Sequence, residues 1–176
     1  MKYDGWRALA ILENGRCHFF SRKHHKYGGY QNLGMALARE VRADRAVFDG
    51  ELVVFDAHGR PVFADLMKSR QAVQYVAFDV LSVNGEDLRA LPLVARKKRL
   101  KRILPSRSSS ILYVDHVKGA GRQLFQLACE LDLEGIVAKR AMSVYGNDNV
   151  TDWIKIKNPR YSQKAGRGDL FKRQVG

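Results

Sequence analysis

The stretch RALAILENGRCHFF, residues 7–20, decides the fold class of this chain. Two largely apolar runs, Arg7 to Leu12 and Arg16 to Phe20, flank the dipeptide Asn14-Gly15. Asn-Gly is typical of two-residue hairpin turns, because both residues tolerate the positive φ angles that these turns require. The sequence therefore predicts an antiparallel hairpin near the start of the chain.

Outward from this hairpin, the chain alternates between patterns of strands and helices. Leu33, Leu37 and Val41 recur at helical spacing, and further helices are expected near residues 64–67, 93–104 and 124–131. The expected strands span residues 46–55, 75–83, 110–117, 135–139 and 153–157. Together these elements predict an α+β fold built on antiparallel sheets.

The composition fits one globular domain. A chain of 176 residues with 45% hydrophobic and 28% charged residues can bury its own core but has no room for a second full domain. The apolar runs are too short to cross a bilayer, and Cys17 and Cys129 have no metal-binding spacing. We expect a cytoplasmic monomer with one domain over residues 1–160 and a basic tail over residues 161–176.

The charge is the first indication of function. The chain has 31 Lys and Arg against 18 Asp and Glu, a net charge of +13 that favours a polyanionic partner. The cluster Arg96-Lys97-Lys98-Arg99 accompanies an apolar stripe at helical spacing, so we interpret it as a solvated helix face. Lys155 and Lys157 would share one face of a strand, which suggests a bound phosphate.

Several polar residues fall where a core strand would not need them. Asp49 and Glu51 share a strand face with valines, and the pattern alone leaves a solvated face and a functional site equally open. Phe78 is by default a core aromatic residue, and Glu134 is by default an acid in a turn. Six short motifs, in a fixed order along the chain, change this interpretation. They are Lys2-Tyr3-Asp4-Gly5-Trp6-Arg7, Ser21-Arg22, Asp49-Gly50-Glu51, Ala77-Phe78-Asp79, Glu134-Gly135-Ile136-Val137-Ala138-Lys139 and Trp153-Ile154-Lys155-Ile156-Lys157.

This series resembles the nucleotidyltransferase motifs of the ATP-dependent DNA ligases. A single Lys-x-Asp-Gly is common by chance, whereas six motifs in order are specific. The resemblance covers nearly the whole chain and is closest to the ligase modules of bacterial end-joining ligases, which also have counterparts of Tyr161-Ser162-Gln163. It implies an antiparallel-sheet nucleotidyltransferase core, the ATP-grasp-like adenylation fold of ligases.

The resemblance also implies a chemistry. Lys2 would attack the α-phosphorus of ATP, expel pyrophosphate and carry AMP as a lysyl phosphoramidate. Glu134 would hold or orient Mg²⁺, while Lys155 and Lys157 would neutralise the α-phosphate. AMP would then pass to the 5′-phosphate of nicked duplex DNA, where the 3′-hydroxyl displaces it.

Four further roles and one additional cation follow from the same resemblance. Glu51 would accept a hydrogen bond from the ribose, and Phe78 would stack on adenine. Arg7 and Arg22 would face the phosphates of AMP and of the DNA 5′ end, because planar guanidinium groups suit phosphate oxygens. Lys139 would belong to the same phosphate-binding shell.

The chain departs from the family pattern at both ends. It starts one residue before Lys2, without the strand that leads into the nucleophile in the family, so we expect Lys2 to fray. It stops soon after Lys157, so we expect the OB-fold domain of the family to be absent. His24 and His25 are expected to be exposed loop residues and not metal ligands.

Three functions remain open. The first is an ATP-dependent DNA ligase core that seals nicks poorly by itself and works with other end-joining repair proteins. The second is an RNA ligase or capping-type nucleotidyltransferase, which a comparison of nicked DNA with RNA ends, and of ATP with GTP, would distinguish. The third is a catalytically silent remnant that only binds DNA.

Overall fold

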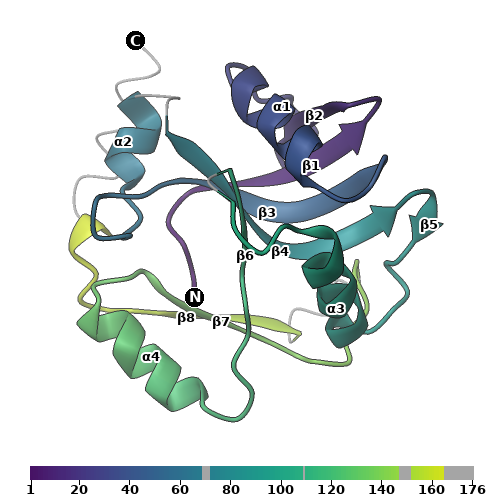
Figure 1. Cartoon of the computed structure of the whole chain (residues 1–176). Coiled ribbons are helices and arrows are strands. Elements are labelled where there is room, and N and C mark those ends of the chain that lie inside the picture. The colour runs from purple at the N-terminus through teal and green to yellow at the C-terminus, as the bar shows by residue number, and fades with distance from the viewer. Residues whose placement is uncertain (69–71, 109, 147–151, 165–176) are drawn as a thin grey trace.

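The structure, a computed structural model, describes residues 1–68, 72–108, 110–146 and 152–164 and contains two β-sheets (Figure 1). The larger sheet has six strands in the order β2-β1-β3-β4-β5, with β6 paired to β4. The smaller sheet pairs β7 with β8 in antiparallel register. The strands are β1 (Trp6–Glu13), β2 (Arg16–Phe20), β3 (Ala46–Val54), β4 (Val73–Val83), β5 (Glu86–Asp87), β6 (Ile111–Tyr113), β7 (Gly135–Lys139) and β8 (Trp153–Lys157).

Four α-helices pack on these sheets in the described part of the chain. Helix α1 (Gln31–Glu40) lies against β2, and α2 (Phe63–Lys68) lies against β3. Helix α3 (Leu93–Ile103) packs on β4, whereas α4 (Gly121–Glu130) packs on β7 of the small sheet. A short 3₁₀ turn, η1 (Ser162–Lys164), follows β8. None of the described helices is long and apolar enough to cross a membrane.

The predicted hairpin is confirmed. Strands β1 and β2 pair antiparallel, and their turn residues Asn14 and Gly15 have φ angles of 50° and 69°. Both angles are positive, as a two-residue hairpin turn requires. The hairpin sets the direction of β1, which then pairs with β3 along the whole of its apolar run.

The two sheets have separate cores of unequal size. The large sheet, with α1 and α3, encloses an extended cluster of buried apolar side chains that includes Phe48 and Tyr75. Among the described residues, the core between α4 and the small sheet has three buried apolar members, which are Ala128, Leu133 and Ile136. The first residues of the chain run between the two sheets, and Lys2 bridges to Gly135 of β7 (Figure 1).

The strand predicted over residues 110–117 is shorter than expected and runs parallel to β4. Only Ile111–Tyr113 pairs with β4. Beyond it, the Val114 carbonyl accepts a hydrogen bond of 2.6 Å from the Lys97 amine, and the chain then leaves the sheet toward α4. The two-residue strand β5 was not predicted, because it is too short to have a periodic pattern.

The interpretation of the basic cluster as a solvated face is wrong for two of its four members. Arg96 is completely buried and Lys97 is 6% exposed. The Arg96 guanidinium makes two hydrogen bonds, of 2.9 and 2.8 Å, to the buried Asp79 carboxylate of β4. Lys98 is exposed, as predicted.

The described chain ends within the tail that was expected over residues 161–176. Residues 161–164, which were expected to belong to the tail, pack on the domain, and Tyr161 is only 6% exposed. Residues 165–176 of the expected tail lie outside the described residues.

Candidate active site

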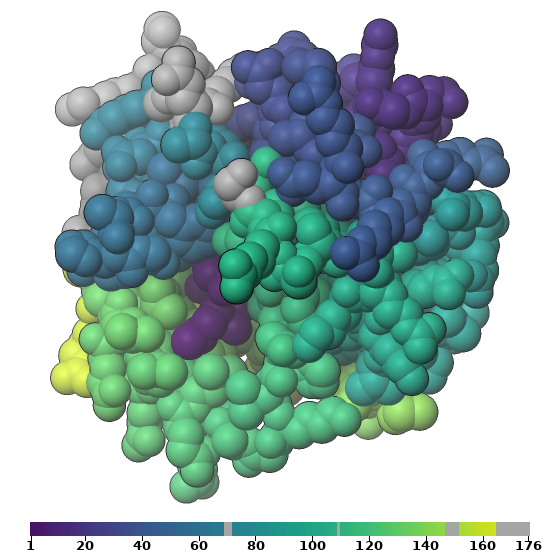
Figure 2. Space-filling view, viewed as in Figure 1, coloured from purple at the N-terminus to yellow at the C-terminus, as the bar shows by residue number. Residues whose placement is uncertain are grey.

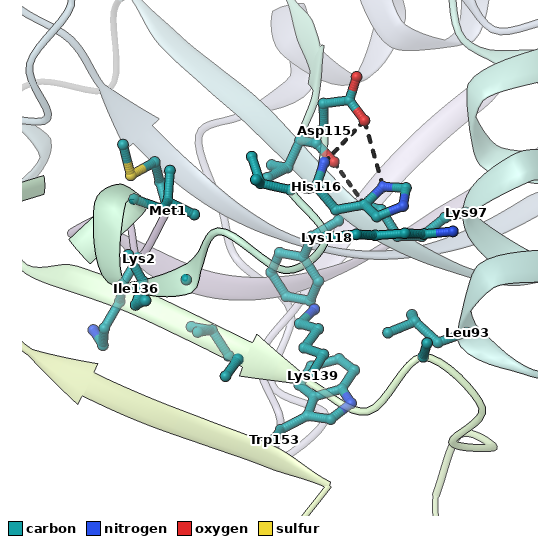
Figure 3. Close-up of a pocket in the computed structure, with 18 of the residues that line it drawn as sticks. Met1, Lys2, Leu93, Lys97, Asp115, His116, Lys118, Ile136, Lys139 and Trp153 are labelled. Atoms are coloured by element: carbon teal, nitrogen blue, oxygen red, sulfur yellow. Dashed lines mark hydrogen bonds and ion pairs between the residues drawn. The ribbon is translucent and has the colours of Figure 1, made fainter. Parts of the chain in front are cut away.

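A cavity of about 550 Å³ lies between the two sheets. Figure 2 shows the purple N-terminal residues set between the blue and teal upper part of the molecule and the green lower part. Strands of both sheets line the cavity, as does the loop between β6 and α4 (Figure 3). Six of the predicted site residues line it, namely Lys2, Arg7, Glu51, Phe78, Lys139 and Lys155.

The loop that carries Lys2 is fixed at several points, although we expected it to fray. The Lys2 backbone N–H donates a 2.8 Å hydrogen bond to the Gly135 carbonyl. The Tyr3 ring meets the edge of Phe55, with centroids 5.8 Å apart. Gly5 lies so close to β3 that a Cβ there would stand 2.2 Å from the Leu52 carbonyl oxygen, so only glycine fits.

Lys2 and Glu134 form an ion pair beside the first residue of β7. The Lys2 amine donates to a Glu134 carboxylate oxygen, and the two side chains are 17% and 7% exposed. The carboxylate stands directly before β7, and Gly135 there adopts a φ of +140°, a backbone conformation that residues with side chains rarely adopt. A nucleophile candidate and a buried carboxylate are therefore in contact at one wall of the cavity.

Glu51 is a second carboxyl group near Lys2. It lies on β3 directly after Gly50, whose backbone packs against the Tyr75 ring and leaves no space for a Cβ. Burial raises the pKa of Glu51 to about 7, with Glu134 adding to the rise and Lys2 opposing it. Glu51 therefore changes charge near neutral pH.

Arg7 is fixed by an acid as well as by aromatic rings. Its guanidinium makes bonds of 3.0 and 2.6 Å to the carboxylate of Asp49, which is completely buried. The Tyr145 hydroxyl donates a further 2.9 Å hydrogen bond to the same carboxylate. The guanidinium also lies 5.8 and 5.6 Å from the ring centroids of Phe78 and Trp153. Arg7 is thus oriented before any ligand binds.

Lys139 places its amine against the same two aromatic rings. The Lys139 nitrogen is 4.1 Å from the Phe78 ring centroid and 3.5 Å from that of Trp153. Lys139 and Trp153 lie side by side at the cavity (Figure 3). Burial lowers the pKa of this amine to about 7. The face of Phe78 that was expected to hold a base is in contact with a lysine.

The remaining predicted residues lie at the edge of the site or outside it. Lys155 lines the cavity from β8, and its side chain is exposed. Arg22, in the turn after β2, and Lys157, at the end of β8, are both exposed and are not among the described residues that line the cavity. Lys155 and Lys157 therefore share a strand face without sharing the cavity.

Three further residues of this region were not predicted as members of the site. Trp153 was quoted within a motif but had no role, although its ring contacts both Arg7 and Lys139. Tyr145 and Tyr161 reach the site through hydrogen bonds to Asp49 and Asp4, over sequence separations of 96 and 157 residues. Sequence spacing gives no signal for such distant contacts.

The two carboxyl groups near Lys2, Glu134 and Glu51, would bind a hard cation only if a substrate supplied further oxygen ligands. Within the described residues, no group of three or more His, Cys, Asp or Glu side chains is arranged to hold a metal ion. Mg²⁺ usually binds one or two carboxylates together with substrate phosphates and waters. Glu134 and Glu51, close enough that Glu134 helps to raise the pKa of Glu51, fit that mode of binding.

A family model and a series of curated proteins match the chain, among them proteins named LigD and LigB. The model of the ATP dependent DNA ligase domain matches residues 1–157. The multifunctional non-homologous end joining protein LigD of Pseudomonas aeruginosa is 35% identical over an alignment of 164 residues, and the match covers 89% of this chain and 19% of LigD. The SPbeta prophage-derived DNA ligase-like protein LigB of Bacillus subtilis is 29% identical over an alignment of 174 residues, and the match covers 93% of this chain and 62% of that protein.

Solved ligase structures have a similar fold. A mycobacterial DNA ligase D complexed with ATP and MES superimposes with a TM-score of 0.73 at 28% identity. The ligase domain of LigD from M. tuberculosis gives a TM-score of 0.71, also at 28% identity. Each match covers 89% of this chain and 52% of the solved chain. The chain thus spans about half of these structures and about a fifth of the P. aeruginosa protein.

Proposed function

The chain belongs to the family of ATP-dependent DNA ligase domains, and from this premise we propose that it forms a covalent lysyl-AMP at Lys2 and passes the AMP to nicked duplex DNA. The observation that carries the proposal is the contact of Lys2 with buried Glu134 at the wall of a cavity lined with cations and aromatic rings.

The reaction would consist of three displacements at phosphorus. First, the unprotonated Lys2 amine forms a bond to the α-phosphorus of ATP while the bond to pyrophosphate breaks. Second, an oxygen of the DNA 5′-phosphate attacks the AMP phosphorus and releases the Lys2 amine. Third, the 3′-hydroxyl attacks the 5′-phosphorus, loses its proton and releases AMP.

The residues around Lys2 have separate tasks in this proposal. Glu134 orients the amine before the attack. Lys155 and Arg7 offer positive charge to the phosphate oxygens, since both line the cavity. Glu51 accepts a hydrogen bond from a ribose hydroxyl. Bound Mg²⁺ would be held by Glu134, with Glu51 beside it, and would supply neutralisation of phosphate charge.

The adenine ring would stack on Phe78. The Lys139 amine would have to move off the Phe78 ring before the base could bind there. The amine of Lys139 now contacts the faces of Phe78 and Trp153. A lysine side chain has several rotatable bonds, so its amine can turn toward the phosphates when a base arrives. The proposed place of Lys139 in the phosphate-binding shell is compatible with this movement.

DNA would bind mainly through its backbone. The net charge of +13 supports attraction to phosphates without readout of base sequence. Arg22 and Lys157, exposed and outside the cavity, are proposed to contact the DNA strand. The non-homologous end joining named for LigD suggests that this chain acts in the same kind of repair, together with other end-joining proteins.

The direct test is incubation with labelled ATP and Mg²⁺, followed by denaturing electrophoresis. We expect one covalent AMP adduct, which Lys2→Ala removes without unfolding the protein. Lys118→Ala is the matched control, since Lys118 also lines the cavity and should leave the adduct intact. An adduct of normal amount in Lys2→Ala would refute the assignment of the nucleophile.

Further substrates separate the alternative functions. Sealing of an ordinary nick with ATP is compared with sealing of a nick that already carries 5′-linked AMP, which avoids the first step. RNA ends and GTP are tested in parallel, and a preference for either would favour an RNA ligase or capping-type enzyme. A protein that binds DNA but acts on none of these substrates would be a silent remnant.

A further inference from the structure

The segment that follows β8, residues 158–164, is hydrogen-bonded to three distant parts of the chain, namely Asp4, residues 61–63 and residues 132–134. We call it the post-β8 segment. Two of its residues, Asn158 and Tyr161, are buried, with 4% and 6% of their surface exposed. A polar side chain that loses its water on folding is usually matched by a specific partner. The partners of these two residues lie beside the proposed nucleophile.

Asn158 holds the backbone that carries Glu134. Its N–H donates a 2.9 Å hydrogen bond to the Glu134 carbonyl. Its side-chain amide donates a second bond, of 3.1 Å, to the Leu133 carbonyl. Asn158 thus fixes the consecutive backbone carbonyls of Leu133 and Glu134. The backbone position from which the Glu134 side chain extends is therefore fixed as well.

Tyr161 holds the loop that carries Lys2. Its hydroxyl donates a 2.9 Å hydrogen bond to the carboxylate of Asp4, which is 1% exposed. Asp4 follows Lys2 by two residues in the same loop. Removal of the Tyr161 hydroxyl takes one hydrogen-bond donor from this buried carboxylate, a cost that a shift of the loop would lower.

We propose that the post-β8 segment sets the position of Lys2 relative to Glu134, with Tyr161 as a positioning residue for Lys2 and Asn158 as a positioning residue for Glu134. Its catalytic consequence rests on the proposed function. A displacement of about 1 Å between reacting groups can cost on the order of 100-fold in rate. The two anchors are only three residues apart, so a single turn of backbone fixes both sides of the ion pair.

The neighbouring residues of the same segment provide the control. The Ser162 backbone donates a 2.9 Å bond to the exposed Asp132 carboxylate. The Gln163 amide donates a 2.8 Å bond to the Pro61 carbonyl and accepts one of 3.3 Å from the Phe63 N–H. These bonds attach the segment to the domain without contact to Lys2 or Glu134. Ser162→Ala therefore removes a hydroxyl from the segment but not from the proposed anchor.

The first measurement needs no enzymatic activity. Wild type, Tyr161→Phe and Ser162→Ala are treated with a small acylating reagent that reacts with amines, at several pH values. Mass spectrometry of the peptides then gives the acylation rate of Lys2 relative to that of the exposed Lys155. The ion pair protects Lys2, so we expect Tyr161→Phe to raise this ratio about 3-fold or more, whereas Ser162→Ala leaves it unchanged. Circular dichroism checks that all three proteins are folded. Equal acylation ratios in the three folded proteins would overturn the proposal.

The second measurement is the rate of AMP adduct formation over a range of ATP concentrations. In Tyr161→Phe we expect the rate at saturating ATP to fall about 10-fold, with less than about a 2-fold change in the half-saturating ATP concentration. A rise in the half-saturating concentration alone would place Tyr161 in ATP binding and would contradict the proposal. If wild type forms no adduct, the proposed function fails, and the acylation ratio still decides the positioning role.

Asn158→Asp tests the other anchor and guards against a Tyr161→Phe protein that does not fold. The substitution is nearly isosteric, but it replaces the amide donor to the Leu133 carbonyl by an oxygen that repels it. We expect the same rise in the Lys2 acylation ratio. An unchanged ratio in Asn158→Asp would exclude the post-β8 segment as the anchor of Glu134.

Discussion

Glu51 is a carboxyl group whose surroundings disfavour its charge. Burial raises its pKa to about 7 in the folded protein, against an ordinary value near 4.5. Its contribution to stability is therefore fully present below about pH 4.5 and is lost as the pH rises through about 7. Glu51→Gln cannot ionise and does not have this loss.

We predict that Glu51→Gln becomes more stable relative to wild type as the pH rises from about 5 to about 8. One pKa unit corresponds to about 1.4 kcal/mol, so the relative gain should be at least about 1 kcal/mol. Urea unfolding at both pH values measures it. Glu13→Gln, at an exposed carboxyl on β1, is the control and should show no such trend. A pH-independent difference between Glu51→Gln and wild type would show that Glu51 ionises normally.

For single residues, the sequence predicted which side chains line the cavity better than it predicted their contacts. Lys2, Glu51 and Phe78 were found through their motifs, and all three line the cavity. The sequence did not predict that Lys139 would lie on the Phe78 face or that Arg7 would be held by Asp49. Both contacts depend on side-chain directions that only the packed sheets determine.

Helix α3 is attached to the large sheet by a buried ion pair. Arg96 and Asp79 are both completely buried, and the third guanidinium nitrogen of Arg96 donates a 3.1 Å bond to the Ser143 carbonyl. We predict that Arg96→Met lowers the free energy of unfolding by about 3–5 kcal/mol, because it leaves the Asp79 charge without its partner. Arg99→Met, which removes a partly exposed pair with Glu86, should cost about 1 kcal/mol or less.

The double variant Arg96→Met/Asp79→Leu distinguishes the charge from the packing of α3. It removes both charges, so it should recover part of the stability lost in Arg96→Met. Denaturant unfolding of the three variants measures the difference. A double variant no more stable than Arg96→Met would show that packing of the arginine stem, and not the uncompensated charge, dominates.

Strand β7 begins at a position that only glycine can occupy. A Cβ on Gly135 would stand 2.1 Å from the Ile156 carbonyl oxygen, and the φ of +140° disfavours other residues. We predict that Gly135→Ala separates β7 from β8, displaces the carbonyl that binds the Lys2 N–H, and abolishes the AMP adduct. Adduct formation and thermal unfolding are measured together.

Gly59→Ala is the control for Gly135→Ala. Gly59 also has a positive φ, of +75°, but a Cβ there meets nothing within 4 Å. It should cost only the backbone strain, on the order of 1 kcal/mol, and keep the adduct. An adduct that survives in Gly135→Ala would show that the close contact with Ile156 is not needed for the site.

Elements with a repeated pattern were predictable, and the others were not. Strands β7 and β8 have the predicted ends, and α1, α3 and α4 lie where apolar spacing placed them. The parallel pairing of β6 was missed, because three residues of alternating pattern do not specify a direction. The buried Arg96 was missed because its sequence neighbourhood is typical of an exposed basic face.

The whole molecule has a strong excess of positive charge, and this should govern its affinity for DNA. A protein that contacts several backbone phosphates releases counterions on binding, so the logarithm of the binding constant falls linearly with the logarithm of the salt concentration. We predict at least about a 10-fold loss of affinity for nicked duplex DNA between about 50 and about 200 mM salt. Fluorescence anisotropy at several salt concentrations measures the slope, and a flat dependence would argue against backbone binding.

The three-residue core beneath the small sheet also sets how the molecule moves. So few buried contacts give β7, β8 and α4 little local stability compared with the large sheet and its extended core. We expect the amide hydrogens of β7 and β8 to exchange with solvent well before those of β3 and β4, through sub-global opening. Because Gly135 belongs to the weaker unit while Gly5 is packed on the stronger one, each such opening would part the two walls around Lys2. A nucleotide that bridges those walls would slow exchange in the small sheet more than anywhere else in the protein.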